Sequence, residues 1–247
     1  MTTKRDVLLM AIPLVEVKKP APAIYHLKGQ LNAGGVTCMA LDANIILYNK
    51  MKDRWEEINR LLQWHNANTD DVLYERVLKA MEDIVNDSII RTDPEWIGVS
   101  IFSLNSRRLG KDLLSFIRSK FPNKKLIIGG MGLGDSLGDT KFEYAVELFE
   151  LGLVDYYITG EAELTMLRFM DALNGKIKFE EVPNLYLKDK NSNIINTNKL
   201  NNIKPMVEGR GWEYYARKES SVPEKLDDLP YPAWHLFNME AYWRSDV

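Results

Sequence analysis

The first part of the chain alternates short apolar runs with longer segments of helical periodicity. Residues 6–12 (DVLLMAI) form an almost continuous apolar run, which is typical of a strand buried on both faces. Further short runs occupy residues 36–41, 96–102, 125–128 and 156–159. The segments between them carry apolar residues at helical spacing. This alternation predicts an α/β domain in which five parallel strands are covered by helices.

Right-handed crossovers make 2-1-3-4-5 the most economical order for the five strands. We place this domain at residues 1–176, with a helical insertion at 43–93. The insertion carries two apolar stripes and therefore predicts two helices; the stripes comprise Ile58, Leu61 and Leu62, then Val72, Leu73, Val77, Met81, Ile84 and Val85. Residues 177–247 are interpreted as a small hairpin, formed by 184–187 and 194–195, followed by a linker.

Composition restricts the possible partners. The chain has 32 Lys and Arg against 35 Asp and Glu, so its formal charge of −3 gives no field to attract nucleic acid or an anionic membrane. No apolar stretch reaches the ~20 residues that span a bilayer, and we expect a cytoplasmic protein. The single cysteine, Cys38, excludes an internal disulfide and a Cys-rich metal site within this chain. The three histidines have no metal-ligand spacing, so neither a metal site nor a catalytic constellation is predicted.

Ligands of open α/β sheets bind outside the carboxyl ends of the strands. The loops there are residues 13–22, 103–108, 129–139 and 160–163, and the third contains five glycines, at positions 129, 130, 132, 134 and 138. Glycine allows positive φ angles and close approach of the backbone to a ligand. The sequence GGMGLGD matches neither common phosphate-binding motif. Glu161 and Glu163 stand at the start of a helix, where helix capping alone would explain them.

The ordered set of segments DVLLMAIP, IGVSIFSLN, LIIGGMG, DYYITGEAE, VPNLYL and LDDLPYPAWHLF resembles the amino-terminal region of cobalamin-dependent radical S-adenosylmethionine enzymes. The resemblance implies a flavodoxin-like (Rossmann-like) domain that holds cobalamin across the carboxyl ends of its strands. Ser100, Ser103 and Asn105 would border the corrin, and the glycine loop would let the nucleotide tail pass. Glu161 would contact the amide edge of the ring. The implied cofactor-binding residues are Pro13, Ser100, Ser103, Leu104, Asn105, Gly129, Gly130, Gly132, Gly160 and Glu161.

The chain departs from the patterns of related proteins in the residues that would face cobalt and in its number of cysteines. Many cobalamin domains have Asp-x-His-x-x-Gly after the first strand, whereas this loop reads PLVEVKKPAP and offers no histidine ligand to cobalt. Leu104 falls where relatives often place a larger residue beneath cobalt, which implies base-off cobalamin of low coordination. Radical chemistry needs three cysteines for a [4Fe–4S] cluster. The cluster and S-adenosylmethionine would therefore belong to a further domain or partner, and this chain would act as cofactor platform or methyl carrier.

Two other functions remain open at this stage. A flavodoxin-like nucleotide-sugar transferase would use the glycine loop and Glu161 on a sugar nucleotide. A degenerate, ligand-free domain could instead bind a protein through Trp55, Trp64 and His65 of the insertion, although ordinary helix packing is the simpler reading of these aromatics. If cobalamin binds, we expect a β-branched residue at Gly130 to abolish binding and to spare the fold.

Overall fold

The computed structural model describes residues 6–63, 70–133, 143–160, 162–197, 229–233 and 239–243. Within these residues the strands form one sheet of order β2-β1-β3-β4-β5-β6-β7. The strands are β1 Val7–Ala11, β2 Cys38–Asp42, β3 Trp96–Ser100, β4 Lys125–Gly129, β5 Tyr156–Ile158, β6 Leu185–Lys188 and β7 Ile194–Asn196. Strands β1 to β5 pair in parallel. The predicted α/β class and the 2-1-3-4-5 order are confirmed, and the arrangement is flavodoxin-like.

The sheet has seven strands rather than the five predicted. The hairpin β6–β7 continues the main sheet, because β6 pairs antiparallel with β5 and β7 pairs antiparallel with β6. Tyr157 lies opposite Tyr186 in this pairing, and their rings stack with centroids 5.3 Å apart. The amino-terminal domain and the hairpin therefore share one sheet.

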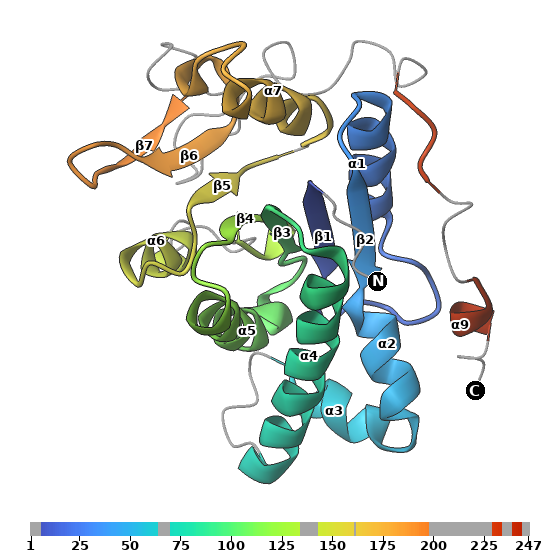
Figure 1. Ribbon diagram of the computed structural model, residues 1–247. Coiled ribbons are helices and arrows are strands. Elements are labelled where there is room, and N and C mark those ends of the chain that lie inside the picture. Colours follow the sequence, from blue (N-terminus) through green and yellow to red (C-terminus); the bar gives the residue numbers. More distant parts are fainter. Residues whose placement is uncertain are drawn as a thin grey trace, which may run out of the picture.

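Helices cover both faces of the sheet (Figure 1). They are α1 Pro22–Ala33, α2 Ala43–Lys50, α3 Trp55–Leu61, α4 Asp71–Thr92, α5 Arg107–Lys120, α6 Glu143–Glu150 and α7 Glu163–Leu173, with a further short helix α9 Met239–Trp243. Single 3₁₀ turns occur at η1 Lys52–Arg54, η2 Leu104–Ser106, η3 Met131–Leu133 and η4 Phe179–Glu181. Helices α1 and α7 cover one face and contact each other, whereas α2 to α6 cover the opposite face.

Strand β1 lies between β2 and β3 and is buried on both faces. Leu8, Met10 and Ile12 belong to the core under α2 to α6. Val7 and Leu9 belong to the core under α1 and α7. The continuous apolar run of the first strand is explained by this two-sided burial, because a half-exposed strand would alternate with polar residues.

The helical insertion contains three α-helices instead of the expected two. The additional helix α2 begins directly after β2, where the carboxylate of Asp42 accepts a hydrogen bond from the Ile45 N–H (3.3 Å) and caps the helix. Val72 belongs to the predicted apolar stripe but is 61% exposed on α4. Trp55 packs edge-on against Tyr48, with ring centroids 5.2 Å apart, as expected of ordinary helix packing. Trp64 and His65 lie outside the described residues.

In the described part of the chain, no helix combines the length and the apolar character that crossing a membrane requires.

Candidate functional site

The loops that follow β1, β3 and β4 are joined to one another by hydrogen bonds at the carboxyl edge of the sheet. The Ile101 N–H donates to the Gly129 carbonyl, and the Gly132 N–H donates to the Ile101 carbonyl, both at 2.8 Å. The Leu14 N–H donates to Ser106 Oγ at 3.0 Å, and Ser103 Oγ donates to the Leu14 carbonyl at 3.3 Å. These hydrogen bonds therefore hold the three loops together as one surface.

Two glycines of the third loop, Gly130 and Gly132, are required by this packing. Gly130 has φ +107°, and a Cβ built on it would lie 2.6 Å from the Ile101 carbonyl oxygen. A Cβ on Gly132 would lie 2.6 Å from the Ser103 nitrogen. The close approach that these glycines permit is thus between two loops of the chain itself. A β-branched residue at Gly130 would strain the fold, which revises the expectation that such a substitution spares it.

Gly129 is less constrained than its neighbours. A Cβ there would lie 3.4 Å from the Ile158 carbonyl oxygen, which is ordinary contact. Gly129 pairs in register with Ser100, which in turn pairs with Ala11. The edge of the sheet thus brings the expected site residues of β1, β3 and β4 side by side. These are Pro13, Ser100, Ser103, Leu104, Asn105, Gly129, Gly130 and Gly132.

Two large apolar side chains are exposed on this edge. Phe102 follows β3 and is 46% exposed, and Met131 follows β4 and is 76% exposed. Exposing them to water is unfavourable, so they mark the edge as a place where an apolar ligand surface would be stabilised. Sequence reasoning missed both residues. The available signal was a large apolar residue at, or a few residues after, the carboxyl end of a predicted strand.

The loop after β5 borders the same edge. Gly160 is exposed with φ +67°, and a Cβ there would meet no atom within 4 Å. Glu161 lies outside the described residues. Helix α7 follows, and its N-cap is Ala162, whose side chain cannot cap the helix. Among the described residues, buried Glu163 Oε2 and Thr165 Oγ1 have no hydrogen-bond partner. Such orphaned atoms are costly unless a ligand or water satisfies them.

Arg107 stabilises the glycine loop after β4 through a hydrogen bond to its backbone. Its Nε donates to the Gly132 carbonyl at 2.7 Å, and its own carbonyl accepts a hydrogen bond from the Tyr144 hydroxyl at 2.6 Å. The guanidinium carbon lies 5.2 Å from the Tyr144 ring centroid. Burial raises the pKa of the Tyr144 phenol, which therefore stays protonated and donates. Arg107 and Tyr144 thus stabilise the loop conformation.

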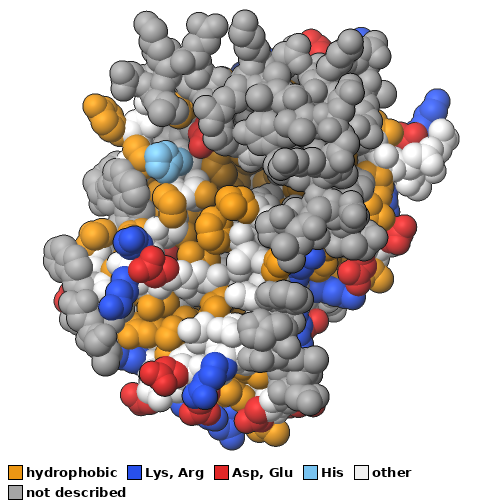
Figure 2. Space-filling view, turned by 180° about the vertical axis from the view of Figure 1, so that it is seen from behind, with side chains coloured by type: hydrophobic (Ala, Val, Ile, Leu, Met, Phe, Trp, Pro, Cys, Tyr) orange, Lys and Arg blue, Asp and Glu red, His pale blue; other side chains and the backbone are white. Residues whose placement is uncertain are grey.

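Acidic and basic side chains lie interspersed on the molecular face shown in Figure 2, with hydrophobic side chains between them. The mixed surface matches the small net charge of −3.

Comparison with known proteins finds a partial sequence match to one protein and a similar fold in solved structures. No protein-family model matches it. A stretch of 90 residues is 31% identical to cytidylyl-2-hydroxyethylphosphonate methyltransferase from Streptomyces wedmorensis, over 36% of this chain and 17% of that protein.

Two structures of the radical S-adenosylmethionine methyltransferase TsrM from Kitasatospora setae are similar to this chain. One contains tryptophan substrate and an S-adenosylmethionine analogue, and the other contains cobalamin and a [4Fe–4S] cluster. Each has a TM-score of 0.53 and 15% sequence identity. The matches cover 78% and 79% of this chain but only 30% and 31% of TsrM. This chain therefore shares its fold with a region that makes up about a third of TsrM.

Proposed function

We propose that this chain binds cobalamin across the carboxyl ends of β1, β3, β4 and β5 and serves as a cofactor platform or methyl carrier. The radical S-adenosylmethionine chemistry would be carried out by a further domain or a partner. The main observation behind this proposal is that Phe102 and Met131 are exposed at the carboxyl edge of the sheet. There the backbone of Gly130 and Gly132 packs closely against the β3 loop. The fold shared with TsrM, whose structure contains cobalamin, supports the same reading.

The residues at the edge fit the chemistry of a corrin. A corrin has a broad apolar plane, which Phe102, Met131 and Leu104 would contact. Burial of several hundred Å² at ~25 cal/mol per Å² corresponds to several kcal/mol before ordering costs. The periphery of a corrin carries amides, which can donate to carboxylates and accept from hydroxyls. Glu163 Oε2, which has no partner among the described residues, has the matching chemistry, as does the predicted contact Glu161.

The first loop leaves cobalt without a protein imidazole. Residues 13–22 contain no histidine, and the Leu104 side chain offers no donor atom. Bound cobalamin would supply a cobalt centre able to carry a methyl group. We therefore assign to Leu104 the role of excluding ligands from one face of the ring, so that cobalamin is held base-off.

The radical step needs groups that lie elsewhere. A [4Fe–4S] cluster takes three or four thiolates, and this sequence has one cysteine, Cys38, which is buried in β2. The contribution of this chain to the reaction would be to bind and orient the cofactor and to keep ligands from its cobalt.

Incubation with hydroxocobalamin, followed by desalting and an absorption spectrum, tests this proposal. We expect a coloured protein with the spectrum of base-off cobalamin. A nitrogen-ligated spectrum would contradict the role assigned to Leu104. A colourless protein that binds a sugar nucleotide tightly would replace cobalamin binding with the transferase function.

A further inference from the structure

Asp42, at the carboxyl end of β2, joins three segments of the chain. The side chain is only 5% exposed. Its Oδ2 accepts hydrogen bonds from the Tyr242 hydroxyl (2.7 Å) and from the Ala21 N–H (3.1 Å). Its Oδ1 accepts from the Ile45 N–H at the start of α2. One buried carboxylate therefore holds the short helix α9, the end of the loop after β1, and α2.

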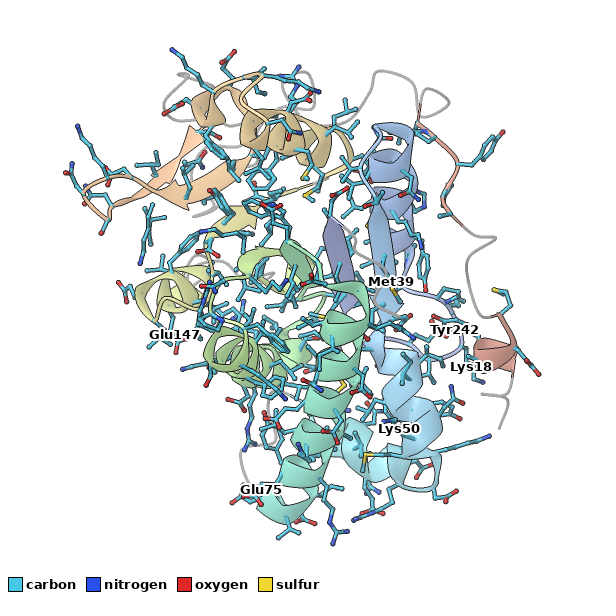
Figure 3. The ribbon with its side chains drawn as sticks, in the orientation of Figure 1. Lys18, Met39, Lys50, Glu75, Glu147 and Tyr242 are labelled. Atoms are coloured by element: carbon cyan, nitrogen blue, oxygen red, sulfur yellow. The ribbon has the colours of Figure 1, made fainter. Side chains whose placement is uncertain are left out.

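The segment that contains Tyr242 has further contacts with the domain. The Ala233 N–H donates to the Tyr25 carbonyl of α1 at 3.2 Å. Asn49 of α2 donates to the Ala241 carbonyl at 3.4 Å. Figure 3 shows Tyr242 on α9, beside the loop that carries Lys18. The described residues 229–233 and 239–243 thus dock against the domain through the Tyr242 hydroxyl and two backbone groups.

The loop between β1 and α1 carries this anchorage to the candidate site. Beside Asp42, Asn44 accepts from the Val15 N–H (3.4 Å) and donates to the Val15 carbonyl (3.0 Å). The preceding residue, Leu14, is held by Ser103 and Ser106, which follow β3. Residues 14–21 are therefore fixed at one end by α9 through Asp42, and at the other end by the β3 loop.

We propose that Asp42 is a positioning residue that couples the docking of α9 to the conformation of residues 14–21. The bond from Tyr242 occupies the same carboxylate oxygen that holds Ala21. Loss of that bond would let the carboxylate rotate and would admit water beside the loop. The importance of this loop for a cofactor rests on the proposed function, whereas the coupling itself is a property of the ligand-free chain.

The test is hydrogen–deuterium exchange on the ligand-free protein with the variant Tyr242→Phe, which removes one hydroxyl. The Leu14, Val15 and Ala21 amides donate hydrogen bonds and should be protected in the unmodified chain. We expect their exchange in the variant to accelerate about tenfold, together with that of 239–243; tenfold corresponds to ~1.4 kcal/mol. The matched control is Tyr231→Phe in the same segment, because Tyr231 is 93% exposed.

Acceleration confined to 239–243, or no acceleration, would overturn the coupling. The β3 amides of Ile97 and Val99 report global unfolding. If Tyr242→Phe destabilises the whole fold, Asn49→Ala removes the bond to Ala241 of α9, together with one to the Ile45 carbonyl inside α2, and leaves the Asp42 carboxylate in place. It should accelerate exchange in 14–21 by a smaller factor, and unchanged exchange there would also reject the proposal. Because no cobalamin is present, these results are independent of whether the cofactor binds.

Discussion

Single residues at the strand ends divide into those that build the edge and those that face outward from it. Gly130 and Gly132 belong to the first group, because the β3 loop occupies the space that their side chains would need. Phe102 and Met131 belong to the second group, because much of their apolar surface is exposed. The two groups should respond differently to substitution, and they provide separate tests of fold and of ligand binding.

Replacing Gly130 by valine should destabilise the fold. The substitution combines a positive φ angle with a clash against the Ile101 backbone, and each effect costs about 1–3 kcal/mol. We expect the free energy of unfolding to fall by roughly 2–6 kcal/mol in urea titrations. Gly129→Ala, whose Cβ would have only ordinary contacts, is the control. Equal stability of the two variants would show that the loops do not pack as described.

Replacing Phe102 or Met131 by alanine should weaken cobalamin binding and leave stability nearly unchanged. The exposed apolar surface of each is available for a ligand, and its loss should raise the Kd about tenfold, or ~1.4 kcal/mol. Val72→Ala, in an exposed position on α4, is the matched control. Spectroscopic titration with hydroxocobalamin measures the effect. If all three variants bind alike, neither residue contacts the cofactor.

At the scale of elements, the hairpin β6–β7 changes how the chain divides. Val182 and Leu185 are fully buried in the core that also contains Val7, Leu9 and Phe169. Thr197 bonds both the N–H and the carbonyl of Leu185 at 3.2 Å. We therefore propose that residues up to 197 fold together with the amino-terminal domain, rather than as a separate appendage.

The variant Leu185→Ala tests this arrangement. Truncation of a fully buried leucine leaves a cavity and should lower the free energy of unfolding by about 2–5 kcal/mol. A single cooperative transition should persist, because the hairpin shares the main core. The partly buried Ile194→Ala is the control and should cost less. A biphasic transition in the unmodified protein, or a loss below about 1 kcal/mol in Leu185→Ala, would favour a separate hairpin unit.

Periodicity predicted the individual elements better than their contacts. The apolar run at 6–12 correctly predicted that β1 is a strand buried on both faces, because its residues lie in the cores on both sides of the sheet. The two segments of the hairpin were also predicted, but periodicity does not determine which strand lies next to β5. Helix α2 was not predicted as a separate element of the insertion, because only its N-cap residue, Asp42, marks where it begins. The Asp42 carboxylate also accepts a hydrogen bond from the hydroxyl of Tyr242, which lies 200 positions away in the sequence. No local pattern could predict this contact.

For the candidate site, sequence predicted the edge of the sheet but not the role of each residue there. The position followed from parallel topology, which brings strand ends together. The glycines were expected to face a ligand, whereas Gly130 and Gly132 face the β3 loop. That distinction depends on packing between loops, to which the sequence offers no periodic signal.

For the molecule as a whole, buried tyrosines link stability to alkaline pH. Burial, as the largest cause, raises the pKa of Tyr25 to about 12, and it also raises the pKa of Tyr74, Tyr144, Tyr157 and Tyr242. Unfolded tyrosines ionise near pH 10. Between pH ~10 and ~12 the unfolded chain therefore binds fewer protons than the folded chain, so stability falls as pH rises.

Urea unfolding midpoints measured at pH 9 and pH 11 test this linkage. We expect the midpoint to fall between these two values, and to fall less in Tyr25→Phe, which lacks one of the shifted phenols. An identical fall in Tyr25→Phe would show that this phenol ionises as readily in the folded chain as in the unfolded chain.

The central claim is that cobalamin occupies the carboxyl edge of the sheet. Amide exchange measured with and without hydroxocobalamin tests it most directly, because it locates the ligand as well as detecting it. We predict protection in residues 101–107, 129–133 and 159–165, and unchanged exchange at the opposite end of the sheet, in residues 93–95 and 120–124. Protection at the opposite end alone, or none at saturating hydroxocobalamin, would contradict the account.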